Sequence, residues 1–86
     1  MFFHGGGFSV GDAAEHLALL DYFASRGLVG IAVNYRLLGK QIEYKMTNSK
    51  LCVSDGRSAI RFVRAHAKEL GIDSNRIAAG GESAGA

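Results

Sequence analysis

The pattern of apolar and polar positions along the chain predicts three short strands and two helices. Residues 1–3, 28–33 and 76–79 are short, mostly apolar segments bounded by turn residues, as is typical of buried strands. Apolar residues recur at helical spacing over residues 12–26 and 49–70. The segment 28–33 is continuously apolar and rich in β-branched residues, which predicts a central parallel strand buried on both faces.

Local start and stop signals support both helices. Asp12 and Glu15 have the spacing of a capping box at the start of the first helix, and Gly27 follows its end. Gly71 ends the second helix in the same way. Residues 38–48 between the second strand and the second helix are polar and predict a loop that can include a short turn of helix. The expected apolar face of the first helix consists of Leu17, Leu20 and Ala24.

The second helix has two distinct faces. Small and apolar residues share one face, and basic residues form a stripe well round from it. A basic stripe can bind phosphate, but on an amphipathic helix it is more typical of a solvated face, which is what we expect here. The apolar face comprises Cys52, Gly56, Ile60, Val63, Ala67 and Leu70, and the basic stripe comprises Arg57, Arg61, Arg64 and Lys68.

The order of these elements defines the fold class. Strands that alternate with helices along a chain form parallel sheets through right-handed crossovers. We therefore expect an α/β architecture with three parallel strands and two crossover helices. The 86 residues fit at most one small domain, residues 1–86, and contain neither a repeat nor an interdomain linker.

Composition excludes several classes of function. A net charge of +2 is too small to indicate nucleic-acid binding, and no apolar run approaches the roughly 20 residues of a membrane span. The single cysteine, Cys52, cannot form an intramolecular disulfide, and no Cys/His cluster has zinc-ligand spacing. We expect neither a metal nor an organic cofactor, and the sequence indicates neither a compartment nor an oligomeric state.

The end of the chain carries the strongest chemical signal. Gly81, Ser83 and Gly85 fit the pattern G-x-S-x-G, directly after the third predicted strand. In this pattern a sharp strand-to-helix turn exposes a serine hydroxyl, and the glycines avoid collisions with the strand and the helix. Because glycine and serine also mark ordinary turns, the pattern depends on its context.

A glycine-rich loop near the start supplies that context. His4, Gly5, Gly6 and Gly7 directly follow the first predicted strand. Consecutive glycines let the backbone approach a ligand and direct N–H groups at one point, as in the His-Gly-Gly-Gly loop of an oxyanion hole. A phosphate-binding loop is the alternative, but neither G-x-G-x-x-G nor G-x-x-x-x-G-K-[ST] occurs in the chain.

Together these motifs resemble the α/β-hydrolase superfamily, and within it the hormone-sensitive-lipase-like carboxylesterases and the related polysaccharide-esterase-like hydrolases. The resemblance implies that residues 1–86 hold the third, fourth and fifth strands of that fold, with the third in the middle, and that the first strands and the C-terminal half are missing. Glu82 also resembles type-B carboxylesterases, and the segment after Leu37 lacks a proline-rich run, so the subfamily stays open. The matching segments are residues 4–8, 34–37, 58–63, 70–77 and 81–85.

The resemblance implies roles for individual residues. Ser83 is the nucleophile that forms an acyl-enzyme, the backbone N–H groups of Gly6, Gly7 and Ala84 form the oxyanion hole, and His4 braces the glycine loop. His4, Gly5, Gly81, Glu82 and Gly85 support the motifs. The triad acid and histidine follow the serine in this family, so none of the three histidines is the base and the fragment alone is expected to be inactive.

The expected substrate is a small-molecule, carbohydrate or lipid ester. A formamidase or other amidase, an acyltransferase, and a non-catalytic relative used for binding stay open as alternatives.

Overall fold

The computed structural model describes residues 1–37 and 45–86. In chain order the elements are β1 (Phe2–Phe3), the 3₁₀-helix η1 (Ala13–His16), α1 (Leu17–Ser25), β2 (Ala32–Val33), α2 (Lys45–Ala65), α3 (Ala67–Leu70), β3 (Gly80–Gly81) and the 3₁₀-helix η3 (Ser83–Gly85). Of the loop predicted over 38–48, residues 38–44 lie outside the described residues. Residues 45–48 belong to α2, so the second helix begins at Lys45 instead of at the predicted 49.

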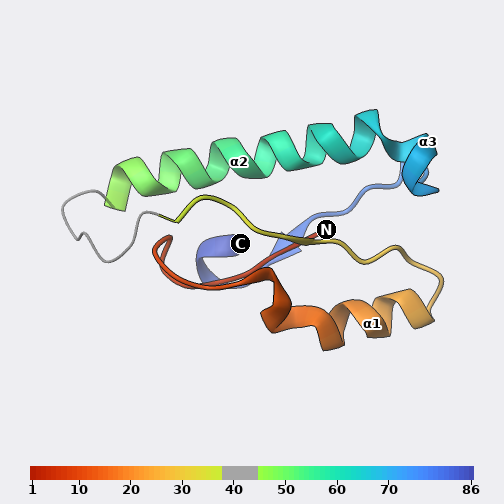
Figure 1. Cartoon of the computed structure of the whole chain (residues 1–86), viewed down its shortest axis with the longest axis horizontal. Coiled ribbons are helices and arrows are strands. Elements are labelled where there is room, and N and C mark those ends of the chain that lie inside the picture. The colour runs from red at the N-terminus through yellow and green to blue at the C-terminus, as the bar shows by residue number, and fades with distance from the viewer. Residues whose placement is uncertain (38–44) are drawn as a thin grey trace.

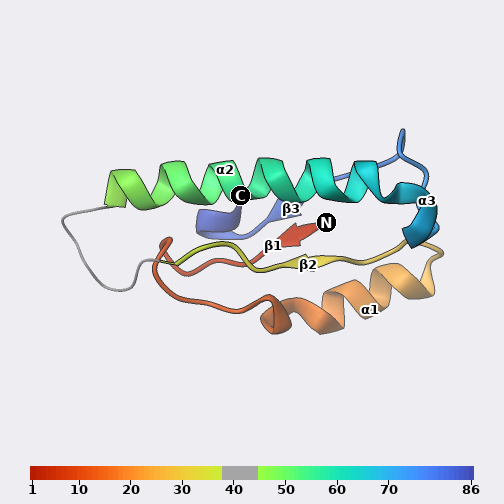
Figure 2. The same ribbon diagram turned by 45° about the horizontal axis from the view of Figure 1, so that its top comes forward.

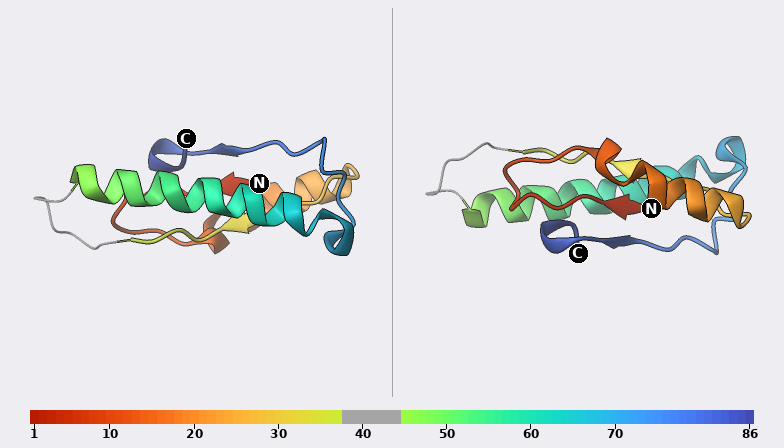
Figure 3. Two further views of the ribbon diagram at one scale, coloured as in Figure 1. Left: turned by 90° about the horizontal axis from the view of Figure 1, so that it is seen from above. Right: turned by 90° about the horizontal axis from the view of Figure 1, so that it is seen from below.

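The three strands form one parallel sheet with β1 in the middle. Phe2 lies opposite Ala32 on one side and Gly80 on the other, so the strand order is β2-β1-β3. The two long helices cover opposite faces of this sheet, α1 on one and α2 on the other (Figures 1, 2 and 3). The predicted α/β class, the parallel crossovers and the central position of the first strand are confirmed.

The two residues of β1 face opposite helices. The Phe2 ring lies against His16 on the α1 side, with 4.7 Å between ring centroids. The Phe3 side chain points to the α2 side and joins Tyr35 and Cys52 in the main buried cluster. Because successive side chains of a strand alternate between faces, two residues are enough to connect both layers of the fold.

The outer strands are shorter and more exposed than predicted. The segment 28–33 is paired only at Ala32–Val33 and forms an edge strand, with Leu28 58% and Val29 54% exposed. The third strand pairs at Gly80–Gly81, and residues 76–79 lie outside the ladder. Since β1 offers two residues for pairing, each neighbour pairs over two residues, and within the described residues 28–33 lies at the edge of the sheet instead of in the expected central position.

The first predicted helix starts and stops where its signals indicated. Asp12 accepts a hydrogen bond from the Ala14 N–H, Glu15 accepts one from the Asp12 N–H, and Gly27 has φ +83°. The helix nevertheless begins as a 3₁₀ turn and is interrupted at His16. Its inward face consists of His16, Leu20 and Phe23, and Leu17 is 52% exposed instead of buried as predicted.

The second predicted helix is divided by a local break at His66 and ends at Gly71, which has φ +69°. Cys52, Val63 and Ala67 are buried as expected, but Leu70 is exposed, which corrects the predicted face at its last turn. The four residues of the basic stripe are exposed, so the solvated face is confirmed.

None of the helices in the described part of the chain has the length and apolarity of a membrane span.

Candidate active site

Ser83 lies at a sharp turn between β3 and η3. Its backbone has φ +52°, whereas Glu82 before it is extended at φ −117° and ψ 135°. The turn is closed by hydrogen bonds from the Gly85 N–H to the Glu82 carbonyl (2.8 Å) and from the Ala86 N–H to the Ser83 carbonyl (3.1 Å). A non-glycine residue in this region stores about 1–3 kcal/mol of strain, and the surrounding contacts must hold it there. The Ser83 side chain is exposed to solvent.

The glycines on either side of Ser83 are required by close backbone approach. A Cβ atom on Gly81 would overlap the Gly85 carbonyl oxygen, and one on Gly85 would overlap the Phe3 carbonyl oxygen. The backbone of the turn therefore packs directly on itself and on β1. This explains in steric terms why the motif has glycine at these two positions.

The glycine-rich loop touches the turn. A Cβ atom on Gly5 would lie 3.3 Å from the Ser83 Cβ and 3.2 Å from the Glu82 carbonyl oxygen. The loop then folds back on itself, because the Ser9 and Val10 N–H groups both donate to the Gly6 carbonyl at 3.1 Å. Among the described residues, the N–H groups of Gly6 and Gly7 donate no hydrogen bond. The glycine-rich loop and the turn at Ser83, from opposite ends of the chain, are thus in contact. The loop keeps two backbone N–H groups that donate no hydrogen bond within the described residues.

His4 connects this loop to the core. Its ring is buried and stacks on Tyr35, with 4.4 Å between centroids and 11° between planes. Nδ1 lies 2.6 Å from the Gly5 carbonyl oxygen and must donate there, because a carbonyl oxygen only accepts. The Tyr35 hydroxyl donates to the His4 carbonyl (2.5 Å), and burial raises the pKa of Tyr35. Ring and backbone of His4 are therefore both held.

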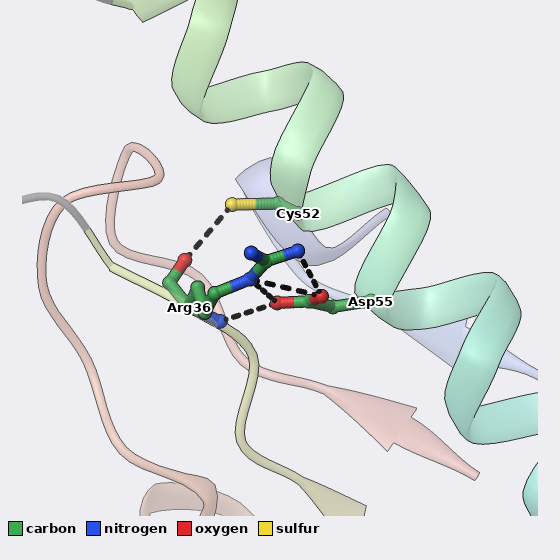
Figure 4. Close-up of polar contacts among 3 residues, drawn as sticks. All are labelled: Arg36, Cys52 and Asp55. Carbon is green, nitrogen blue, oxygen red and sulfur yellow. Dashed lines mark hydrogen bonds and ion pairs between the residues drawn. The ribbon is translucent and has the colours of Figure 1, made fainter.

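Residues after β2 are tied to α2 through a charged pair (Figure 4). The Arg36 guanidinium donates from Nη2 to Asp55 Oδ1 (2.8 Å) and from Nε to Oδ2 (2.9 Å), and the Arg36 N–H also donates to Oδ2 (2.9 Å). Cys52 Sγ donates to the Arg36 carbonyl at 3.2 Å. These bonds fix the segment that carries Tyr35, so they support His4 indirectly.

This pair should make stability depend on pH. Hydrogen bonds from the Arg36 side chain and then its N–H hold the pKa of Asp55 below its usual 3.8. The stabilisation is present above pH 3.8 and is lost as the pH falls through the lower, folded value. We expect Asp55→Asn to lower the Tm of the intact protein by roughly 2–5 °C at pH 6, a modest effect because solvent screens this partly exposed pair. The difference should shrink towards pH 3. Asp21→Asn on the exposed face of α1 is the control, and an unchanged Asp55→Asn difference at low pH would contradict the assignment.

The three histidines all lie in the described residues, and each contacts another residue, although Nε2 of His4 and Nε2 of His16 make no hydrogen bond there. His4 is buried beside Tyr35, His16 Nε2 lies 3.0 Å from Glu82 Oε2, and His66 Nδ1 lies 2.8 Å from the Phe62 carbonyl. No sequence pattern predicted the roles of Tyr35 and Asp55 or the contact between His16 and Glu82. Tyr35 and Arg36 do lie in segment 34–37, which matches the α/β-hydrolase superfamily. The described residues bring together no cluster of three or more His, Cys, Asp or Glu side chains suited to a metal.

Comparison with known proteins gives consistent matches over the whole chain. Residues 1–86 match the BD-FAE family. The structure of Est2, a thermophilic esterase from the planctomycete Thermogutta terrifontis, is similar with a TM-score of 0.84 and 44% identity, over 98% of this chain and 29% of the esterase. Structures of Est2 with propionate and with butyrate bound match equally well.

Two relatives extend the comparison. Esterase LipI of Mycobacterium tuberculosis is 33% identical over 86 residues, which are 99% of this chain and 25% of LipI. The juvenile hormone esterase of Heliothis virescens is 34% identical over 91 residues, which cover 100% of this chain and 16% of that protein. The chain thus spans less than a third of each relative, and the predicted α/β-hydrolase fold is confirmed.

Proposed function

This chain belongs to the BD-FAE family and has the fold of an α/β-hydrolase esterase, and from this premise we propose that it carries the nucleophile and part of the oxyanion hole of a serine carboxylesterase. The observation that carries the proposal is Ser83, held at φ +52° on the strand-to-helix turn with its side chain in solvent and the glycine-rich loop against it. A strained and exposed serine at this turn is the arrangement of a nucleophile elbow.

The proposed reaction begins with attack of Ser83 Oγ on the ester carbonyl carbon. A general base takes the hydroxyl proton, and the carbonyl oxygen becomes a tetrahedral oxyanion. Collapse of this intermediate expels the alcohol, which takes up a proton, and leaves an acyl group on Oγ. Water then attacks the acyl carbon in the same way, which releases the carboxylic acid and restores the serine.

We assign the oxyanion hole to the backbone N–H groups of Gly6, Gly7 and Ala84. Gly6 and Gly7 are free to donate, and Ala84 lies in the first turn of η3, where N–H groups lack a partner within the helix. Such donors typically contribute about 3–4 kcal/mol each to transition-state stabilisation. Because the triad acid and histidine follow the serine in the chain order of this fold, we propose that the base is a histidine outside residues 1–86, oriented by an acidic residue.

The proposed substrates are esters of short linear acids. Est2, which is 44% identical to this chain, is described with propionate and butyrate bound, and these are the acids that such esters release. We therefore expect p-nitrophenyl propionate and butyrate to be turned over faster than long-chain esters. The matching amides and an acceptor alcohol in the same panel separate an esterase from an amidase or an acyltransferase.

The test is direct labelling of the intact protein, which here means residues 1–86 together with the part that supplies the proposed base. A fluorophosphonate should form one adduct, which peptide mass spectrometry locates at Ser83, and prior incubation with p-nitrophenyl butyrate should slow the labelling. Labelling at another serine, or no labelling together with no turnover of the ester panel, would overturn the proposal and favour a binding role for this fold.

A further inference from the structure

We propose that His16 is a positioning residue that holds the nucleophile turn through the side chain of Glu82. The inference rests on the proposed function of Ser83. It assigns a task to a histidine that lies on the first crossover helix and does not touch the reacting atoms.

The contact joins two segments from opposite ends of the chain. His16 Nε2 lies 3.0 Å from Glu82 Oε2, which is within ion-pair distance. Nε2 is shielded from solvent and makes no hydrogen bond of good geometry within the described residues, so the Glu82 carboxylate at 3.0 Å is the polar group that it contacts. A shielded polar atom without a hydrogen-bond partner is costly, which favours keeping the carboxylate beside it.

His16 is itself rigidly placed. Its ring packs at a tilt on Phe2 of the central strand, and the residue sits at the junction between η1 and α1. The helix start is anchored from two sides, by the Asp12 cap and by a hydrogen bond from the Ala13 N–H to Asn34 Oδ1 (2.8 Å) at the end of β2. The ring therefore offers a fixed point to whatever it contacts.

Glu82 connects His16 to the nucleophile turn, because it directly precedes Ser83. The Glu82 N–H donates to the Phe3 carbonyl (3.2 Å), and the Glu82 carbonyl accepts from the Gly85 N–H (2.8 Å). Hydrogen bonds therefore hold both backbone polar groups of Glu82. Its side chain is 61% exposed, and His16 is the partner that restrains it. Because Ser83 follows at a strained φ of +52°, a restraint on Glu82 limits rotation of the turn that aims Oγ.

The experiment compares His16→Leu with His16→Gln in the intact protein. We expect His16→Leu to lower kcat for p-nitrophenyl butyrate and the rate of fluorophosphonate labelling by about 10- to 100-fold, with KM nearly unchanged, because a small misplacement of a reacting group costs that much. His16→Gln keeps an N–H donor and should restore most of the rate. His66→Leu, which removes another helix histidine, should leave kcat unchanged.

A double-mutant cycle tests that His16 acts through Glu82. In a Glu82→Leu background, His16→Leu should have little further effect on kcat. NMR spectra at one fixed pH give a readout independent of activity, since the imidazole nitrogen shifts of His16 should change in Glu82→Gln and those of His66 should not.

The outcomes separate this inference from the proposed function. If the wild-type protein neither labels nor turns over esters, both fall. If the wild type is active and His16→Leu keeps full kcat, or loses it equally with and without Glu82, the positioning role alone is overturned. Should His16→Leu fail to fold, His16→Gln, Glu82→Leu and the NMR shifts still decide the question.

Discussion

Replacing Ser83 with alanine should lower kcat/KM for p-nitrophenyl butyrate by about 10⁴- to 10⁶-fold in the intact protein, because it removes the atom that forms the acyl bond. The activity that remains would come from binding and the oxyanion donors alone, which still act on a water molecule. The fold should persist, since the Ser83 side chain is exposed and the turn is closed by backbone hydrogen bonds on either side of it. Steady-state kinetics and a thermal melt measure the two effects separately.

The control for this prediction is Ser58→Ala. Ser58 is an exposed serine on α2, away from the turn, and its hydroxyl has no place in the proposed chemistry. We expect its kcat/KM to equal that of the wild type within a factor of two or so, since surface substitutions of this kind change little. A Ser83→Ala enzyme with more than about a tenth of wild-type activity would show that another group is the nucleophile.

Replacing Gly85 with alanine should lower the free energy of unfolding by about 3 kcal/mol or more, at the upper end of what overpacking costs. The new Cβ would overlap the Phe3 carbonyl oxygen and lie 2.6 Å from the His4 carbonyl oxygen. Neither oxygen can move freely, because the Phe3 carbonyl accepts from the Glu82 N–H and the His4 carbonyl accepts from the Tyr35 hydroxyl. Relief would have to come from separating η3 from β1, which would also displace Ser83.

A matched control lies five residues earlier on the same strand-and-turn segment. A Cβ on Gly80 meets no atom within 4 Å, so Gly80→Ala should change the free energy of unfolding by less than about 1 kcal/mol. Urea denaturation of both variants gives the comparison. Equal stability of Gly85→Ala and Gly80→Ala would mean that the close approach of η3 to β1 does not hold in solution.

The match between sequence signals and structure is closest where the signal is local. The Asp12–Glu15 capping box and the glycine stops at Gly27 and Gly71 act over a few residues, and the structure has them where they were predicted. The strand limits were predicted less well, because the length of a strand depends on how much its neighbour offers for pairing. The same dependence moved the third strand from 76–79 to Gly80–Gly81.

At the nucleophile turn, some features follow from the local sequence and others from the tertiary structure. The sequence by itself determined a glycine-flanked serine after a strand and a glycine-rich loop after another, because the steric demands of such turns admit few residue types. Only the tertiary structure decided that the loop and the turn meet, that Tyr35 holds His4, and that Arg36 pairs with Asp55. It also decided that His16 faces Glu82. The partners in these contacts lie far apart in the chain and are residue types common on any surface, so their pairing follows from the sheet order that brings both ends of the chain together at β1.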